Sequence, residues 1–252
     1  MSDTEDEIAS TLPRDLDALP RRRGFRLRGL AMTRLEGFVD ATFAFAVTML
    51  IIAGQQVPDD VSALLAAFRH VPAFAASIAL LAIFWRGHWV WSRRFGLEDG
   101  VSVLISWVLI FTMLIYVYPL KVVFGGMFAV LSDLRVGQVI GVRSTGEARA
   151  IFAVYSLGFT ALASGITLLN LRAWYLRRAL RLNERETLMT RGAIEGWSIP
   201  VVIGLVSIVL SLVLPRSRIG WSGWIYYSLA VLLPLHGRTF ERRLARLARA
   251  ER

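Results

Sequence analysis

Residues 34–54 read RLEGFVDATFAFAVTMLIIAG, and this stretch decides the fold of the chain. Its charged residues all lie before position 41, and the next charged residue in the sequence is Asp59. At about 1.5 Å per residue, a helix over the uncharged part is long enough to cross the roughly 30 Å hydrocarbon layer of a bilayer. The stretch therefore predicts a first transmembrane helix.

The residues of this helix divide between two faces. Side chains that recur every three or four residues share one face of a helix. Asp40 points about 200° away from Phe38 around the helix axis. We therefore expect one face to line a path or an interface, while Asp40 is held by its own subunit. The residues of the first face are Arg34, Phe38, Ala41, Phe45, Thr48 and Ile52.

The composition indicates a polytopic α-helical membrane protein. Of the 252 residues, 55% are hydrophobic, and the mean hydropathy is +0.53. The apolar residues come in long blocks, which is unlike a soluble domain. The net charge of +10 comes from arginines between these blocks, which is typical of the positive-inside bias and argues against nucleic-acid binding. The absence of cysteine excludes disulfides and thiolate sites, and three scattered histidines favour no metal cluster.

The apolar blocks predict six spans in an all-α fold. After the first helix we expect spans at about 71–91, 101–119, 150–171, 197–214 and 221–235, with a short helix at 61–68. Whether residues 122–131 form a short interfacial helix stays open at this stage. The fourth span is expected to continue as a basic helix through Arg181. Most of the lysines and arginines then fall on one side of the membrane, which predicts cytosolic N- and C-termini.

Three regions follow from this layout. Residues 1–30 are expected to be a mobile cytosolic tail, residues 31–236 the six-helix transmembrane domain, and residues 237–252 a cytosolic amphipathic tail lying on the membrane surface. The acidic residues that precede the first arginines, and the lack of an apolar core before position 33, do not fit a cleaved signal peptide.

Two motifs in the chain resemble those of a known protein family. The sequence RLEGFVD at residues 34–40, followed by an apolar helix, resembles the Arg-x-x-x-Phe-Ser-Asp signature of the transmembrane-protein-175 family, with Val39 in place of the serine. The sequence FWRGH at residues 84–88, in the second span, also resembles that family. The family comprises an endo-lysosomal potassium channel and its bacterial relatives.

The resemblance implies a potassium-permeable channel in a bacterial inner membrane. Because no second copy of the first motif follows residue 120, it implies a one-repeat homotetramer. It also implies that the first helix lines the pore, with a hydrophobic constriction and no cofactor beyond the permeant potassium ion. The family usually has Ile or Leu where this chain has Phe45. The implied pore-lining residues are Phe45, Thr48, Met49 and Ile52.

A polar layer is expected at the inner ends of the first two spans. An ionisable group within a bilayer is costly unless it is paired, so Asp40 should find donors. The indole N–H of Trp85 and an imidazole N–H of His88 lie one turn apart and are suitable, and Arg34 could join them or a neighbouring subunit. Whether this layer tunes gating or only stabilises the fold stays open at this stage.

Other classes of protein remain to be separated from a channel. The stripe that contains Phe45, Thr48 and Ile52 could equally pack against another helix. A secondary transporter would normally carry internal repeats, broken helices and charged groups near the membrane midplane, and only Asp40 is a candidate acid within the spans. No constellation of catalytic residues indicates an enzyme, and a scaffold is the remaining alternative.

The expected partners are further copies of the chain and lipids, including anionic headgroups near 172–191 and the C-terminal tail.

Overall fold

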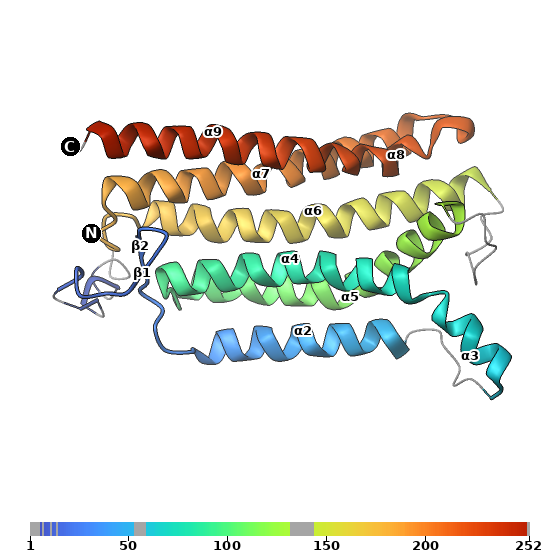
Figure 1. The fold of residues 1–252 in the computed structure, drawn as a ribbon, viewed down its shortest axis with the longest axis horizontal. Coiled ribbons are helices and arrows are strands. Elements are labelled where there is room, and N and C mark those ends of the chain that lie inside the picture. Colours follow the sequence, from blue (N-terminus) through green and yellow to red (C-terminus); the bar gives the residue numbers. More distant parts are fainter. Residues whose placement is uncertain are drawn as a thin grey trace.

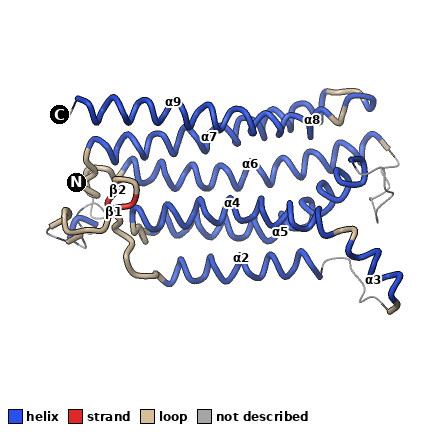
Figure 2. The backbone as a smooth tube through the Cα atoms, viewed as in Figure 1, coloured by secondary structure: helices blue, strands red, loops and turns tan. Residues whose placement is uncertain are grey.

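The computed structural model is almost entirely α-helical and describes residue 6 and residues 8–10, 12–13, 15–52, 59–131 and 144–250 (Figures 1 and 2). A short antiparallel hairpin, β1–β2, precedes the long helices. The elements are β1 Arg21–Arg22, β2 Phe25–Arg26, α2 Arg34–Ile52, α3 Val61–Phe68, α4 Val71–Phe95, α5 Gly100–Leu131, α6 Thr145–Tyr175, α7 Glu184–Val213, the 3₁₀ helix η1 Arg216–Arg218, α8 Trp221–Trp224, the 3₁₀ helix η2 Ile225–Ser228 and α9 Leu229–Ala250.

The long helices lie side by side, with α2 at one edge of the bundle and α9 at the other (Figure 1). Helix α2 packs on α4 and α5, α6 packs on α5 and α7, and α9 packs on α7. The N- and C-terminal parts of the chain lie at one end of the bundle, whereas α3 and α8 lie at the opposite end. The edge position of α2 leaves one of its faces without a partner in this subunit.

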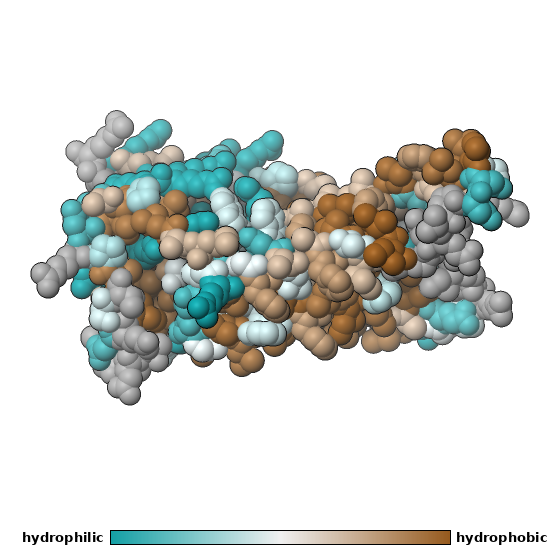
Figure 3. All heavy atoms as spheres, turned by 90° about the horizontal axis from the view of Figure 1, so that it is seen from below, coloured by the Kyte–Doolittle hydropathy of each residue, from teal (hydrophilic) through white to brown (hydrophobic). Residues whose placement is uncertain are grey.

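Five helices of the described chain are long and apolar enough to cross a membrane, namely α2, α4, α5, α6 and α7. The core between them is built from fully buried residues such as Leu81, Met113, Leu162 and Ile166, which come from α4, α5 and α6. Hydrophilic residues gather toward the end that carries the termini, and hydrophobic ones cover the middle of the face seen in Figure 3. This separation is what a bundle standing across a bilayer requires.

The structure agrees with the sequence for the second span and for the short helix before it. Helix α3 covers residues 61–68 as expected, and α4 begins at Val71 with Pro72 in its first turn. The third span is longer than predicted. We expected it to end at Pro119, and the sequence left open whether residues 122–131 form a short interfacial helix. In the structure α5 continues through Pro119 to Leu131, so these residues belong to the same helix. Helices in membranes tolerate an internal proline because neighbouring groups satisfy the freed carbonyl.

The connection between α6 and α7 also differs from the prediction. Helix α6 ends at Tyr175 instead of continuing through Arg181, which has a positive φ of 47° in the turn that follows. Helix α7 begins at Glu184, well before the expected start at Trp197. The reason is a capping box, in which Asn183 accepts from the backbone N–H of Glu186 and the Glu186 carboxylate accepts from the backbone N–H of Asn183.

The C-terminal tail is not a separate surface helix. Residues 237–250 continue α9, which runs along α7. Phe240 packs on Gly192 of α7, a position where a larger side chain would collide with the ring. Arg243 pairs with Glu195 at 2.9 Å, and His236 Nε2 lies 3.0 Å from the Gly192 carbonyl oxygen. These contacts explain why the basic tail stands against the bundle.

The described residues directly before α2 do not form a mobile tail. Phe25 is completely buried and packs edge-on against Phe95 of α4. The backbone N–H of Gly29 donates to the Arg93 carbonyl, and a side chain at position 29 would collide with the Ser92 carbonyl. The residues from β1 to Leu30 are therefore docked onto the ends of α4 and α7.

Candidate functional site

The face of α2 predicted to line a path lies largely open in the described subunit. All six of its residues are exposed, including Phe45 at 56% and Ile52 at 60% of their maximal accessibility. The opposite face is buried against α4 and α5 through Val39, Ala46 and Leu50. We call the exposed set the α2 stripe: Arg34, Phe38, Ala41, Phe45, Thr48 and Ile52.

Two residues named with the stripe behave differently from the others. Met49 is half-buried and packs against the core of its own subunit, so it does not share the exposed face. Phe38 is 46% exposed, and its ring lies 5.0 Å from the ring of Trp107 on α5. Phe45, Thr48 and Ile52 are thus the open part of the stripe.

Asp40 is held by one of the two donors expected for it. The indole Nε1 of Trp85 donates to Asp40 Oδ1 at 2.6 Å, which ties α2 to α4. The Trp85 ring also stacks on Phe43 at 5.7 Å, so aromatic packing supports the hydrogen bond. A hydrogen bond to an ionised acceptor is stronger than one between neutral groups, which suits an acid placed inside a span.

His88 is not a donor to Asp40. Its Nε2 lies 3.1 Å from the hydroxyl oxygen of Ser106 on α5, and only 2% of the residue is accessible. The Ser106 hydroxyl itself donates to the Ser102 carbonyl, so its oxygen is left to accept a hydrogen bond from Nε2–H. The sequence signal for this partner was the Ser102–Ser106 pair, spaced by four residues in an otherwise apolar helix.

Arg34 makes no side-chain contact among the described residues, but the acid that follows it does. Glu36 is 2% exposed and pairs with Arg93 of α4 at 3.2 Å. The Arg93 guanidinium also donates to the carbonyls of Gly29 and Leu30, at 3.1 and 2.9 Å. Sequence reasoning missed this pair because Glu36 and Arg93 lie far apart in the chain and only the packing of α2 on α4 brings them together.

The site therefore has two parts, a fixed N-terminal half of α2 and the exposed residues of the stripe that follow it. The Glu36–Arg93 and Asp40–Trp85 contacts hold the N-terminal half of α2 on α4, and the His88–Ser106 contact holds α4 on α5. Nothing in the described subunit covers Phe45, Thr48 or Ile52. Such a helix presents a mostly apolar surface in a defined orientation to whatever lies beside the subunit.

A bundle of several apolar helices with one such open helix defines a multi-pass membrane protein, and comparison with known proteins gives its family. The family described as "Endosomal/lysosomal potassium channel TMEM175" matches residues 34–119, which begin at Arg34 and include α4. A protein from Marivirga tractuosa named "Potassium channel" is 31% identical over 236 residues, covering 88% of this chain and 93% of that protein. The chain belongs to the TMEM175 family.

A solved structure agrees with this assignment. The crystal structure of a single-substitution variant of the potassium channel MtTMEM175, in complex with a nanobody–MBP fusion protein, superposes with a TM-score of 0.77 at 27% sequence identity. The match covers 89% of this chain and all of that chain. The fold described above is therefore that of a TMEM175 channel protein.

Proposed function

We propose that the protein is a potassium-permeable channel made of four identical subunits, with the ion path along α2 of each. The observation that carries this proposal is the α2 stripe, which is exposed while the opposite face of the same helix is buried. The ion is suggested by the names of its relatives, since the family description and the Marivirga tractuosa protein both specify a potassium channel. Four stripes facing one axis would enclose a narrow, mostly apolar path.

The constriction in this proposal is made of rings of Phe45 and Ile52, with Thr48 between them. Apolar rings control ion passage by dewetting, and they offer no carbonyl oxygens to replace the hydration shell. Selectivity then depends on the cost of removing water from each ion. The Thr48 hydroxyl donates to the Ala44 carbonyl at 3.0 Å, so the free lone pair of its oxygen can face a passing cation.

The topology that goes with this path has six spans and cytosolic termini. The proposed sixth span consists of α8, η2 and the first turns of α9, where residues 231–235 are all exposed and mainly apolar. Both termini lie at the same end of the bundle, and arginines concentrate there, as the positive-inside rule requires of a cytosolic face. We place the protein in the bacterial inner membrane.

Anionic lipids are the proposed partners of the cytosolic end. Arg178 and Arg181, in the turn between α6 and α7, are exposed, and Arg178 makes no side-chain contact among the described residues. Basic residues next to a membrane surface attract anionic headgroups. This contact is separate from the ion path.

A secondary transporter is the alternative, and ion flux separates the two. Purified protein in potassium-loaded liposomes should release potassium passively, at a rate that follows an imposed voltage and needs no second ion. Protein-free liposomes prepared in parallel give the background. Flux that requires a coupled ion or substrate would identify a transporter, and no flux from tetrameric protein would contradict the channel.

A further inference from the structure

A row of exposed side chains marks the outer turn between α7 and α9. Arg218, Trp221, Trp224 and Tyr227 recur at every third residue, and we call them the outer ladder. All four are exposed, with 63% for Trp221, 53% for Trp224 and 49% for Tyr227. The ladder lies at the end of the bundle opposite the chain termini (Figure 1).

The local backbone aligns these side chains. Arg218 ends the 3₁₀ helix η1, and Tyr227 lies in the 3₁₀ helix η2, with the single turn of α8 between them. A 3₁₀ helix has three residues per turn, so residues three apart lie above one another, whereas in an α-helix they are offset by about 60°. Trp224 and Tyr227 accordingly stack at 5.1 Å with an angle of 28°.

The inner side of the same turn is pinned to the bundle. Ser222 is fully buried, its hydroxyl donates to the Ile219 carbonyl at 2.6 Å, and its own carbonyl accepts from the Ser207 hydroxyl of α7 at 2.7 Å. Gly223 faces the ring of Phe152 so closely that an added Cβ would lie 3.0 Å from it. The ladder is therefore a fixed outward surface.

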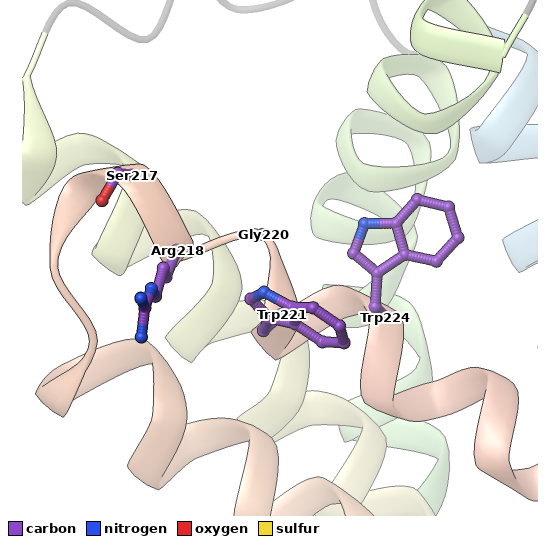
Figure 4. Close-up of a pocket in the computed structure, with 5 residues that line it drawn as sticks. All are labelled: Ser217, Arg218, Gly220, Trp221 and Trp224. Atoms are coloured by element: carbon purple, nitrogen blue, oxygen red, sulfur yellow. The ribbon is translucent and has the colours of Figure 1, made fainter.

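Three residues of the ladder, Arg218, Trp221 and Trp224, line an open pocket of about 510 Å³. Its lining residues are Ser217, Arg218, Gly220, Trp221 and Trp224 (Figure 4). The described lining residues thus combine one cation with two indole rings and include no carboxylate. The Arg218 side chain has no hydrogen-bond or ion-pair partner among the described residues, so its guanidinium is available to an anion.

The position of the ladder indicates that its occupant comes from the bilayer. Helices α7 and α9 lie at the edge of the bundle away from α2, and α2 packs on α4 and α5 (Figure 1). This step rests on the proposed function, because a tetramer with α2 around its axis puts α8 and α9 on the lipid-facing rim. Tryptophan and tyrosine concentrate at the headgroup level of membranes, where one side of the ring is apolar and the other is wet.

We propose that the outer ladder binds an anionic phospholipid of the outer leaflet, with phosphatidylglycerol as the chemical class. The Arg218 guanidinium matches a phosphate in charge and in its planar set of donors, and the Trp221 and Trp224 rings contact the glycerol and the upper acyl chain. A headgroup that carries an ammonium group is disfavoured, because none of the described residues that line the pocket is a carboxylate that could pair with it. Tyr227, at the uncharged end of the ladder, contacts the same acyl chain closer to the membrane interior.

Native mass spectrometry of the full-length protein with dioctanoyl phosphatidylglycerol tests this site. Arg218→Gln is expected to weaken lipid binding about tenfold, the effect of losing one charge-assisted hydrogen bond. Arg69→Gln is the control, because Arg69 is exposed at the same end of the bundle but outside the ladder, and it should bind as the unchanged protein does. Equal binding by Arg218→Gln, or an equal loss in Arg69→Gln, would overturn the proposal.

Two further measurements separate a lipid from other occupants. Inorganic phosphate should bind far more weakly than the lipid, and equal binding would mean a general anion site in place of a lipid site. The described chain has no cysteine, so Tyr227→Cys introduces a single thiol, and oxidation that joins two copies through it would show a subunit interface there. None of these readouts uses ion flux, so lipid binding by a protein that conducts no ions would refute the channel and leave the site.

Discussion

Replacing Glu186 with alanine is expected to lower the free energy of unfolding by about 3–5 kcal/mol, the cost of breaking a buried ion pair. The Glu186 side chain is completely buried and accepts from two arginines of the N-terminal segment. Arg26 donates through its backbone N–H at 2.9 Å and through its guanidinium at 2.8 and 3.0 Å, and Arg28 donates at 2.9 and 3.3 Å. The substitution leaves two buried guanidinium groups without the carboxylate that they share, and they keep mainly backbone carbonyls as acceptors.

The ion pair with Glu186 also fixes the charge state of Arg26. The hydrogen bond to Glu186, opposed in part by burial, raises the pKa of Arg26 above its usual value, so this arginine stays protonated in the folded protein at any ordinary pH. A guanidinium keeps its proton in proteins even without a partner, so Arg26 cannot escape the loss of Glu186 by becoming neutral. One half of the Asn183 capping box is lost together with the ion pair, because the backbone N–H of Asn183 loses the Glu186 carboxylate as its acceptor, and this adds to the cost.

A matched control lies on the same helix. Glu195 also contacts two arginines, Arg191 at 3.2 Å and Arg243 at 2.9 Å, but its side chain is 32% exposed. Exposed pairs contribute about 0–1 kcal/mol, so Glu195→Ala should change the melting temperature little, whereas Glu186→Ala should lower it by roughly 10 °C. Similar melting temperatures for the two variants would mean that burial of the Glu186 cluster has little effect on stability.

Replacing Phe45 with alanine is expected to raise potassium conductance several-fold and to lower the preference for potassium over sodium. In the proposed tetramer this substitution removes four phenyl groups from the narrowest part of the path, so ions pass with more of their hydration shell. The residue is 56% exposed in the subunit, so little intrasubunit packing is lost and the fold should remain intact. Single-channel recording with mixed potassium and sodium solutions measures both quantities.

Ile51→Ala is the control for Phe45→Ala. Ile51 is also apolar, exposed at 50%, and on α2, but it lies about 120° around the helix from Phe45. Its truncation should leave conductance and ion preference unchanged. An unchanged current in Phe45→Ala, or equal changes in both variants, would place the constriction elsewhere.

The elements that sequence could predict are those fixed by local chemistry. Helices α2, α3 and α4 follow from uncharged length, amphipathic spacing and Pro72. Helical periodicity predicts which residues share the stripe, whereas the exposure of the stripe depends on the edge position of α2, which the sequence left open. The Asp40–Trp85 hydrogen bond was predictable because an intramembrane acid needs a donor and the antiparallel spans put these two side chains at one depth.

The features that sequence reasoning missed depend on tertiary contacts. Phe25 is buried and Arg26 pairs with Glu186, and both contacts depend on residues far away in the chain. From the sequence alone, the run of arginines around them is typical of a solvated tail. His88 was assigned to Asp40, but the neighbouring helix α5 supplies Ser106 instead. The start of α7 had a local signal, since an Asn residue followed three positions later by Glu186 is a capping box pattern.

Cysteine accessibility along α2 tests the central claim most directly, because the chain has no native cysteine and each introduced thiol is unique. Single substitutions Thr48→Cys, Ile52→Cys and Ile51→Cys are placed in liposomes, and potassium flux is measured before and after a positively charged, thiol-reactive methanethiosulfonate reagent is added. A path along the α2 stripe predicts that the reagent blocks flux in Thr48→Cys and Ile52→Cys and spares Ile51→Cys. Block in Ile51→Cys alone, or in none of the three, would contradict a pore lined by this face of α2.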